Sequence, residues 1–186
     1  AHGGGNNPTT TSRPAPATGT DTYSAIAAAV GSLKGPKHGG ANRQVLAQFS
    51  LIKQTVRDWK DDDAVADCVG RILRRELGDG SGLIYGMGHA VYTLSDPLTV
   101  ILRKSARTLA AQRGMLDELE LMEAVERVTP RVFAEITGHE KVMCANVDMY
   151  SGLIYQMLDI PPDLFTPLFA VARNTGWCAH RMEEVL

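Results

Sequence analysis

The sequence predicts an all-α protein, and three observations lead to that prediction. Apolar residues recur every three or four positions over most of the chain, which is the spacing of one helix face. Residues that favour helix starts, mainly Asp, Thr and Pro, precede several of these segments, and glycine or basic residues end several others. Strand-like alternation is confined to a few residues near positions 83–85. We therefore expect a multi-helical fold.

The amino-terminal third divides into a loop and two helices. Residues 7–20 are rich in Pro, Thr, Ser and Gly and predict a loop or a poorly ordered arm. A helix is expected at residues 21–33, because Thr and Asp suit its N-cap and alanines follow. A second helix is expected to open at His38. Its apolar positions have helical spacing: Val45, Leu46, Phe49 and Ile52.

The remaining two thirds predict further helices. Residues 62–77 begin with acidic residues and end with two arginines before Gly78, which suits the two ends of the helix dipole. Residues 96–113 begin with Asp at an N-cap position and Pro in the first turn. Four more segments with helical spacing complete the set: residues 118–128, 130–136, 146–158 and 165–186.

Composition limits the class of protein. A chain of 186 residues with 44% hydrophobic residues can bury one core, or one domain plus part of another. The formal charge is −2 and the basic residues are scattered, so nothing indicates a nucleic-acid partner. The three cysteines (Cys68, Cys144 and Cys178) have no C-x-x-C spacing, which argues against a disulfide framework or zinc knuckle and favours a reducing compartment.

Targeting and membrane signals are missing from the sequence given. No apolar run approaches the ~20 residues that cross a bilayer, and the first residues lack the order of a signal peptide. We therefore predict a soluble, cytoplasmic protein with no membrane partner. The chain begins within what looks like a site at His2 and stops inside a helical pattern, so we expect a piece of a longer protein.

Three histidines in glycine-rich segments indicate chemistry on a small molecule. They are His2, His38 and His89, and Asp148 follows in an Asn-Val-Asp turn. Glycine beside an imidazole is costly in a core helix but suits a turn that aims a side chain or approaches a ligand. Three such histidines and a carboxylate suggest proton transfer.

Five sequence blocks together resemble the carboxy-terminal half of citrate synthases, and most nearly the citrate/2-methylcitrate synthase group. The resemblance covers nearly the whole chain and keeps the family's order. The blocks are His2-Gly-Gly-Gly-Asn6, Gly35-Pro-Lys-His-Gly-Gly-Ala-Asn42, Gly86-Met-Gly-His-Ala-Val-Tyr92 with Ser95-Asp-Pro97, Asn146-Val-Asp-Met-Tyr-Ser-Gly152, and Phe169-Ala-Val-Ala-Arg173 followed by Gly176-Trp177. A dinucleotide loop is not indicated, because Val91 stands where its third glycine would be.

The resemblance implies an acyltransferase that condenses acetyl-CoA or propionyl-CoA with oxaloacetate, giving citrate or 2-methylcitrate and CoA. By position, Asp148 would be the base that takes the methyl proton, and His38 the donor to the thioester oxygen. His89 would hydrogen-bond the oxaloacetate carbonyl. A place for His38 at a helix start would favour its neutral form, because the positive end of the dipole disfavours imidazolium.

The resemblance also assigns the binding residues. His2 and Arg173 would hold oxaloacetate carboxylates, Arg173 as a forked donor. The segment expected to wrap CoA consists of Leu83, Ile84, Gly86, Met87 and Gly88. Acyl-CoA would be a substrate, with no tightly bound cofactor and no metal. Residues 39–145 would form a small domain inserted between two parts of a large domain, residues 1–38 and 146–186, in a homodimer.

Two features oppose catalysis by this chain. The family's arginine after Asp-Pro is Leu98 here, and a lost carboxylate contact costs ~2–5 kcal/mol in a buried site; Arg103 is a possible substitute. The family's last substrate arginine lies beyond Leu186. These features favour a second reading, a non-catalytic fragment that retains the helical core or the CoA surface.

Other readings of the same residues stay open. Asp148 could cap its helix as well as act as base. A metal hydrolase using the three histidines and Asp148 is a third possibility, although none of the pairs has a helical H-x-x-x-H spacing. Citrate and 2-methylcitrate synthesis cannot be separated, because their acyl groups differ by one methylene, worth only ~1–3 kcal/mol in a pocket.

Overall fold

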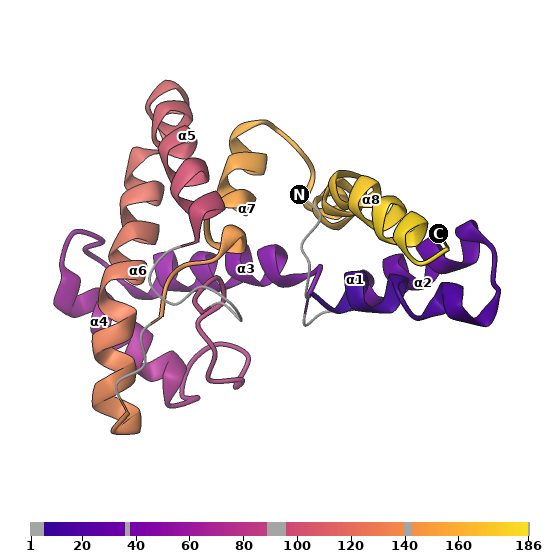
Figure 1. Ribbon diagram of the computed structural model, residues 1–186. Helices are drawn as coiled ribbons and strands as arrows, with labels where there is room; N and C mark the ends of the chain where they lie inside the picture. The colour runs from indigo at the N-terminus through magenta and orange to yellow at the C-terminus, as the bar shows by residue number, and fades with distance from the viewer. Residues whose placement is uncertain (1–5, 36–37, 89–95, 140–142, 186) are drawn as a thin grey trace. The chain divides into compact units, whose positions relative to one another are not determined.

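The structure is a computed structural model that describes residues 6–35, 38–88, 96–139 and 143–185 (Figure 1). Within these residues it is built of α-helices with two short 3-10 helices, and it contains no strand. Only an isolated antiparallel bridge pairs Met87 with Ala145. The all-α prediction is confirmed. No helix in the described ranges is both long enough and apolar enough to cross a bilayer.

The chain folds into two compact units. Unit 1 comprises Ala1–Gly40 and Asp163–Leu186, and unit 2 comprises Ala41–Pro162. The candidate large and small domains, with boundaries at residues 38–39 and 145–146, are a functional division and stay a prediction. The structural division places the whole of helix α7, residues Val147–Met157, in unit 2.

Unit 1 is a small helical cluster. Its elements are α1 (Asn7–Ser12), η1 (Ala15–Thr18), α2 (Thr22–Lys34) and α8 (Phe165–Glu183). Helix α1 packs against α2 and α8, and α2 packs against α8 (Figure 1). Ala29 and Leu33 of α2 meet Trp177 of α8 in a core where all three side chains are fully buried. The helix predicted at residues 21–33 is confirmed, with Asp21 as the N-cap of α2, and the one predicted at residues 165–186 is present but ends at Glu183.

The prediction of a loop at residues 7–20 was wrong in part, because α1 and η1 lie there. Asn6 caps α1 by accepting a hydrogen bond from the Thr9 amide at 3.1 Å. Pro8 suits the first turn, since its missing N–H would have no partner there. Ser12 donates to the Thr9 carbonyl at 2.8 Å and is buried. Residues typical of turns therefore serve here as caps and as back-bonding groups.

Unit 2 holds the larger core. Its helices are α3 (Ala41–Thr55), α4 (Asp62–Leu73), α5 (Pro97–Arg113), α6 (Leu116–Thr137) and α7 (Val147–Met157), and a short 3-10 turn, η2 (Pro162–Leu164), lies at its junction with unit 1. Helix α6 packs against α4, while α3 and α5 both pack against α7 (Figure 1). Gly152 of α7 permits the approach of α3, because a Cβ there would lie 3.0 Å from Leu46. The helix predicted at residues 96–113 is confirmed, with Asp96 as N-cap and Gly114 in the left-handed conformation after it.

Helix α6 replaces two predicted helices. Residues 118–128 and 130–136 were expected to be separate because Pro130 lies between them, but one helix runs through it. The hydroxyl of Thr129 donates to the Val125 carbonyl at 2.6 Å. The apolar face continues across the proline, where Val125, Val128 and Val132 are at most 5% exposed. Burial of this face against α4 outweighs the hydrogen bond that proline removes.

Helix α4 ends earlier than predicted. The helix expected at residues 62–77 stops at Leu73, and Arg75 adopts the left-handed conformation with φ 65°. The Glu76 amide donates to the Arg71 carbonyl at 2.9 Å, which closes the helix end. The C-terminal turn therefore forms at an arginine, before Gly78.

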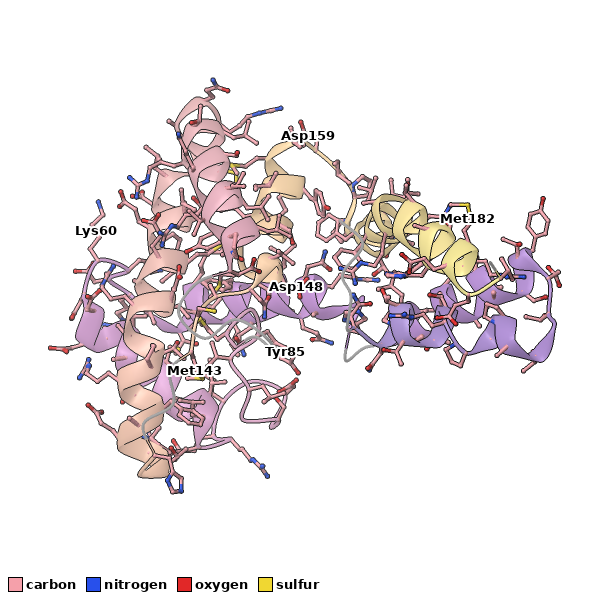
Figure 2. The ribbon with its side chains drawn as sticks, in the orientation of Figure 1. Lys60, Tyr85, Met143, Asp148, Asp159 and Met182 are labelled. Carbon is pink, nitrogen blue, oxygen red and sulfur yellow. The ribbon has the colours of Figure 1, made fainter. Side chains whose placement is uncertain are left out.

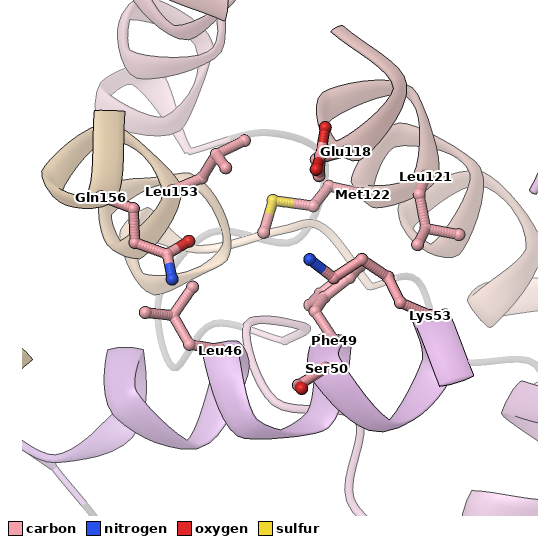
Figure 3. Close-up of a pocket in the computed structure, with 9 residues that line it drawn as sticks. All are labelled: Leu46, Phe49, Ser50, Lys53, Glu118, Leu121, Met122, Leu153 and Gln156. Atoms are coloured by element: carbon pink, nitrogen blue, oxygen red, sulfur yellow. The ribbon is translucent and has the colours of Figure 1, made fainter. Parts of the chain in front are cut away.

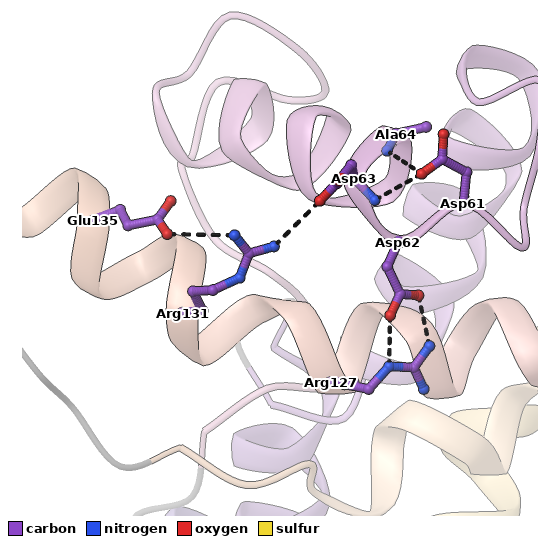
Figure 4. A network of polar contacts seen from close by, with 7 residues as sticks. All are labelled: Asp61, Asp62, Asp63, Ala64, Arg127, Arg131 and Glu135. Atoms are coloured by element: carbon purple, nitrogen blue, oxygen red, sulfur yellow. Dashed lines mark hydrogen bonds and ion pairs between the residues drawn. The ribbon is translucent and has the colours of Figure 1, made fainter.

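Ion pairs join the start of α4 to α6 (Figure 4). Arg127 donates to both Asp62 carboxylate oxygens, at 2.9 and 2.6 Å, and this hydrogen bonding lowers the pKa of Asp62. Arg131 lies 3.9 Å from Asp63 and 3.4 Å from Glu135. The acidic helix start predicted from the dipole therefore also forms ion pairs with α6.

Candidate functional site

The predicted site residues are distributed over both units. His38 and Arg173 belong to unit 1, whereas residues 83–88 and Asp148 belong to unit 2. His2 and His89 lie outside the described residues. Each group is therefore considered within its own unit.

The His38 turn is held to α2 and α8. The His38 amide donates to the Gly35 carbonyl at 3.1 Å, and the Gly39 amide donates to the Leu33 carbonyl at 2.9 Å. The Thr166 hydroxyl of α8 donates to the Gly39 carbonyl at 2.7 Å. A Cβ at position 39 would lie only 2.2 Å from the Leu33 oxygen, so glycine is required beside His38.

The His38 ring lies against α8. Its ring meets Phe169 edge-on, with centroids 6.2 Å apart and planes at 82°. Burial and then the positive charge of Arg173 lower the pKa of His38 from its ordinary value of 6.5. Its Nε2 atom is buried and has no hydrogen-bond partner in the described part of the chain. The ring is therefore neutral at pH 7, with one nitrogen that a ligand could engage.

The expected cause of this neutrality was wrong. The sequence placed His38 at a helix start, but α3 begins at Ala41 and His38 lies in the preceding turn. The structure attributes the lowered pKa to burial and Arg173. The predicted protonation state is unchanged, while its physical origin is the environment that α8 provides.

Arg173 is fixed by an aromatic side chain one turn before it. Its guanidinium carbon lies 4.4 Å from the centroid of the Phe169 ring, in cation–π contact. The side chain is half-buried on α8. His38, Phe169 and Arg173 thus form one cluster within unit 1, and it combines a neutral imidazole with a cation that suits a carboxylate.

Asp148 lies in the first turn of α7, and the alternative that it caps this helix was wrong (Figure 2). The cap is Asn146, whose Oδ1 accepts from the Asp148 amide at 2.9 Å. Asp148 is partly exposed, and after burial its charge is the second cause that raises the pKa of Tyr155 two turns along α7. The Asp148 carboxylate therefore does not serve as the N-cap of α7.

The predicted CoA segment is clamped at its start by Gln48 of α3. The Gln48 amide donates to the Leu83 carbonyl at 2.9 Å, and its oxygen accepts from the Tyr85 amide at 3.0 Å. The Tyr85 hydroxyl also donates to Asp79 at 2.6 Å. Gln48 is buried on a mostly apolar face of α3.

The end of the same segment lies against the start of α7. Gly86 has φ 86°, and a Cβ there would lie 2.9 Å from the Cα of Met149. The Asn146 amide donates to the Gly86 carbonyl at 2.9 Å, and the Gly88 amide donates to the Cys144 carbonyl at 2.8 Å. The structure therefore brings Gly86 and Gly88 next to the turn that carries Asp148.

Leu98 and Arg103 face different surroundings. Leu98 is 56% exposed in the first turn of α5. Arg103 is paired with Glu126 at 3.4 Å, and Glu126 also accepts a hydrogen bond from Tyr150. A cavity of about 120 Å³ adjoins this group. Its lining residues are Asp96, Thr99, Val100, Arg103, Glu126, Cys144 and Ala145. The Glu126 carboxylate already compensates the charge of Arg103, so Arg103 is poorly suited to replace the family's arginine.

A second cavity lies among α3, α6 and α7, away from the predicted residues (Figure 3). Its volume is about 100 Å³, and it has apolar walls with a polar rim. Lining residues are Leu46, Phe49, Ser50, Lys53, Glu118, Leu121, Met122, Leu153 and Gln156. In the described ranges, no three His, Cys, Asp or Glu side chains gather as a metal would require.

Sequence reasoning missed three residues that support the site. Gln48 is a polar residue between the buried apolar positions Val45 and Ile52 of α3, and that misfit was a usable signal. Phe169 lies four positions before Arg173, a spacing that allows contact on a helix. Asn146 two residues before Asp148 fits an N-cap, but nothing in the sequence shows that it reaches Gly86 and Gly88.

Comparisons with known proteins agree on one family. The sequence profile described as "Citrate synthase, C-terminal domain" matches residues 1–185. The chain is 42% identical to a citrate synthase of Synechocystis over 89% of its length, and 38% identical to 2-methylcitrate synthase 1 of Corynebacterium glutamicum over 90%. It spans 38% and 39% of the lengths of these two relatives.

Solved structures give the same result. The citrate synthase of Thermotoga maritima matches 96% of this chain with a TM-score of 0.74 and 31% identity. A citrate synthase of Thermoplasma acidophilum, solved as a ternary complex with carboxymethyl coenzyme A and oxaloacetate, matches 97% with a TM-score of 0.76 and 30% identity. The chain covers 44% of each of these two structures.

Proposed function

The chain belongs to the citrate synthase family, and from that premise we propose that the protein carrying it condenses acetyl-CoA or propionyl-CoA with oxaloacetate. The products are citrate or 2-methylcitrate and free CoA. The observation that carries the proposal is that the Gly86–Gly88 segment is hydrogen-bonded in unit 2 to Cys144 and Asn146, the residues directly before the helix turn that carries Asp148. Acyl-CoA and oxaloacetate are substrates, and the reaction requires no bound cofactor.

Proton transfer begins the proposed reaction. Asp148 takes a proton from the carbon next to the thioester carbonyl, and His38 donates a hydrogen bond to the thioester oxygen as negative charge develops there. The resulting enolate carbon attacks the ketone carbon of oxaloacetate, which His89 polarises, and the ketone oxygen takes up a proton as the carbon–carbon bond forms. Water then hydrolyses the thioester and releases the CoA thiol. His2 and Arg173 hold the carboxylates of oxaloacetate.

The chemistry of unit 1 supports these roles. A neutral imidazole keeps one N–H that can donate a hydrogen bond to a developing oxyanion, and burial together with Arg173 favours the neutral form of His38. Arg173 keeps its position against the Phe169 ring. Both groups lie on or against α8, so one helix supports the proposed donor and the proposed carboxylate ligand.

Assembly and location belong to the same proposal. We infer a homodimer in which helices of the α7 and α8 region take part, as the family resemblance implies, and residues 39–145 as the domain that closes over the substrates. A cytoplasmic location is supported by Cys68, Cys144 and Cys178, since none of them forms a disulfide within the described residues.

Release of CoA thiol tests the proposal. The intact protein that carries this chain is mixed with oxaloacetate and either acetyl-CoA or propionyl-CoA, and the thiol is measured over time. We expect thiol release that depends on both substrates. Absence of thiol above background with both acyl-CoA substrates would show that the proposal is wrong, and metal analysis of the same sample would test the hydrolase alternative.

An Asp148→Asn substitution tests the assigned base. Because general-base catalysis contributes about 10²–10⁴-fold, we expect kcat to fall by that factor while the Kd for acyl-CoA stays nearly constant. Asn146 provides the N-cap, so the free energy of unfolding should change little. Retained exchange of the acyl methyl protons with solvent would remove Asp148 from the mechanism.

Leu98, which stands where the family resemblance implies an arginine, favours a second candidate function, a protein of this family that no longer condenses its substrates. If a missing carboxylate contact limits activity, Leu98→Arg should raise kcat/KM for oxaloacetate about tenfold or more. The matched control is Val100→Arg, two positions along α5 and also exposed. An unchanged kcat/KM for Leu98→Arg would mean that another group fills this role or that the acceptor is a different molecule.

A further inference from the structure

One asparagine joins the two segments of unit 2 on which the proposed reaction depends. The Asn146 side chain has two ends with different partners: Oδ1 accepts from the Asp148 amide at 2.9 Å, and Nδ2 donates to the Gly88 carbonyl at 2.9 Å. Its backbone N–H donates to the Gly86 carbonyl at 2.9 Å. The amide therefore serves as helix cap and cross-link at once.

Neighbouring contacts reinforce this junction. The Gly88 amide donates to the Cys144 carbonyl at 2.8 Å, and Met87 pairs with Ala145 in the isolated bridge. Gly86 lies against Met149, so closely that a Cβ on residue 86 would lie 2.9 Å from the Met149 Cα. A shift of the first turn of α7 would therefore break several hydrogen bonds to the glycine segment at once.

We propose that Asn146 is a positioning residue of the condensation, fixing the first turn of α7, which carries Asp148, against the Gly86–Gly88 segment. This inference rests on the proposed function. Asparagine fits the task because an amide has both a donor and an acceptor end, whereas serine or aspartate can cap a helix but cannot also donate to the Gly88 carbonyl at that distance. Small displacements of a reacting group cost up to about 10²-fold in rate, so this link affects chemistry more than binding.

The decisive variant is Asn146→Ser in the intact protein. Serine retains an oxygen that can cap α7 but removes the donor to Gly88. We expect kcat to fall about tenfold or more, with KM for acyl-CoA within about threefold of wild type. Asn146→Ala removes both ends and should give the same loss of kcat with an additional loss of stability.

Two other variants separate positioning from general loosening. Gln48→Glu keeps an acceptor for the Tyr85 amide but loses the donor to the Leu83 carbonyl, so it disturbs the far end of the same segment. It should raise KM for acyl-CoA more than it lowers kcat. Asp61→Ser alters the N-cap of α4, away from this junction, and controls for cap replacement in unit 2.

Amide hydrogen exchange provides a readout that does not depend on activity. In Asn146→Ser, the Gly88 and Asn146 amides should exchange about tenfold faster or more, while the capped Asp148 amide keeps its protection. In Asn146→Ala, the Asp148 amide should lose protection as well. A merely structural role would change all three amides together.

The outcomes separate the two proposals. If the wild-type protein turns over and the kcat of Asn146→Ser is within about threefold of the wild-type value, the role of Asn146 is overturned while the proposed function stands. Unchanged exchange of the Gly88 amide in Asn146→Ser has the same consequence. The same KM and kcat pattern in Asn146→Ser and Gln48→Glu would indicate general loosening and also overturn it. A wild-type protein that releases no thiol overturns the proposed function, and the exchange data then decide by themselves whether the cross-link exists.

Discussion

The two units hold their candidate residues by different means. In unit 1, the His38 turn depends on residues near it in sequence, Leu33 and Gly35, together with α8. In unit 2, the Asp148 turn depends on Gly86 and Gly88, which lie far from it in the sequence. Both units place a glycine at the point of closest approach.

The two units also differ in their cores and in the hydrogen bonding of the polar groups near the candidate residues. The unit 1 core centres on Ala29, Leu33 and Trp177, and its His38 Nε2 and Trp177 Nε1 atoms are buried with no partner among the described residues. In unit 2 the glycine segment is hydrogen-bonded through its backbone to Cys144 and Asn146, directly before α7. Unit 1 thus determines the protonation state of His38, and unit 2 determines the position of Asp148.

Gly39→Ala tests the local closure in unit 1 and has the largest expected effect. The added Cβ would lie 2.2 Å from a backbone oxygen that cannot move independently, so we expect about 3 kcal/mol or more of destabilisation. Urea unfolding measures it. Gly35→Ala is the matched control, since its Cβ would approach nothing closer than 3.7 Å. Equal stability of the two variants would contradict the tight closure at Gly39.

Gly86→Ala tests the long-range contact in unit 2, with a smaller expected effect of about 2–3 kcal/mol. Part of this is the left-handed φ of 86°, which costs a non-glycine residue about 1–2 kcal/mol, and the rest is the contact with Met149. Gly88→Ala isolates the first part, because its φ is 91° and no described atom lies within 4 Å of its Cβ. In thermal unfolding, the Tm of Gly86→Ala should be lower than that of Gly88→Ala, and the reverse order would refute the packing argument.

The pH dependence of stability tests the electrostatic side of unit 1 and has the smallest expected effect, because His38 is only half buried. Its pKa is lowered in the folded state, so the unfolded chain binds a proton more readily as pH falls below 6.5. The free energy of unfolding should therefore decrease as pH falls from 6.5 toward the folded pKa. The slope should be shallower in His38→Gln, measured by urea unfolding between pH 5 and 7.5, and shallower in Arg173→Met as well.

A matched histidine control completes this experiment. His139 lies at an exposed position after α6, and His139→Gln removes a histidine without touching the His38 cluster. The wild-type slope should persist in that variant. If His38→Gln retains the full wild-type slope, another group is responsible for it.

Much of the fold was determined by the sequence alone. Apolar spacing gave the helices, and local capping residues placed starts such as Asp21 and Asp96, because these signals act within one or two turns. The errors came where packing outweighs local preference. Pro130 lies inside α6 because the face it interrupts is buried against α4, and residues 7–12 form a helix because α2 and α8 cover it.

The candidate site divides in the same way. The sequence predicted roles for His38, Asp148, Arg173 and the glycine segment from residue types and the order of the motifs, neither of which requires knowledge of distances. Only the tertiary structure decided that Asn146 caps the Asp148 turn and holds Gly88, and that Arg173 and burial lower the pKa of His38. Hydrogen bonds and electrostatic fields depend on separation in space, and folding brings together residues that sequence spacing leaves far apart.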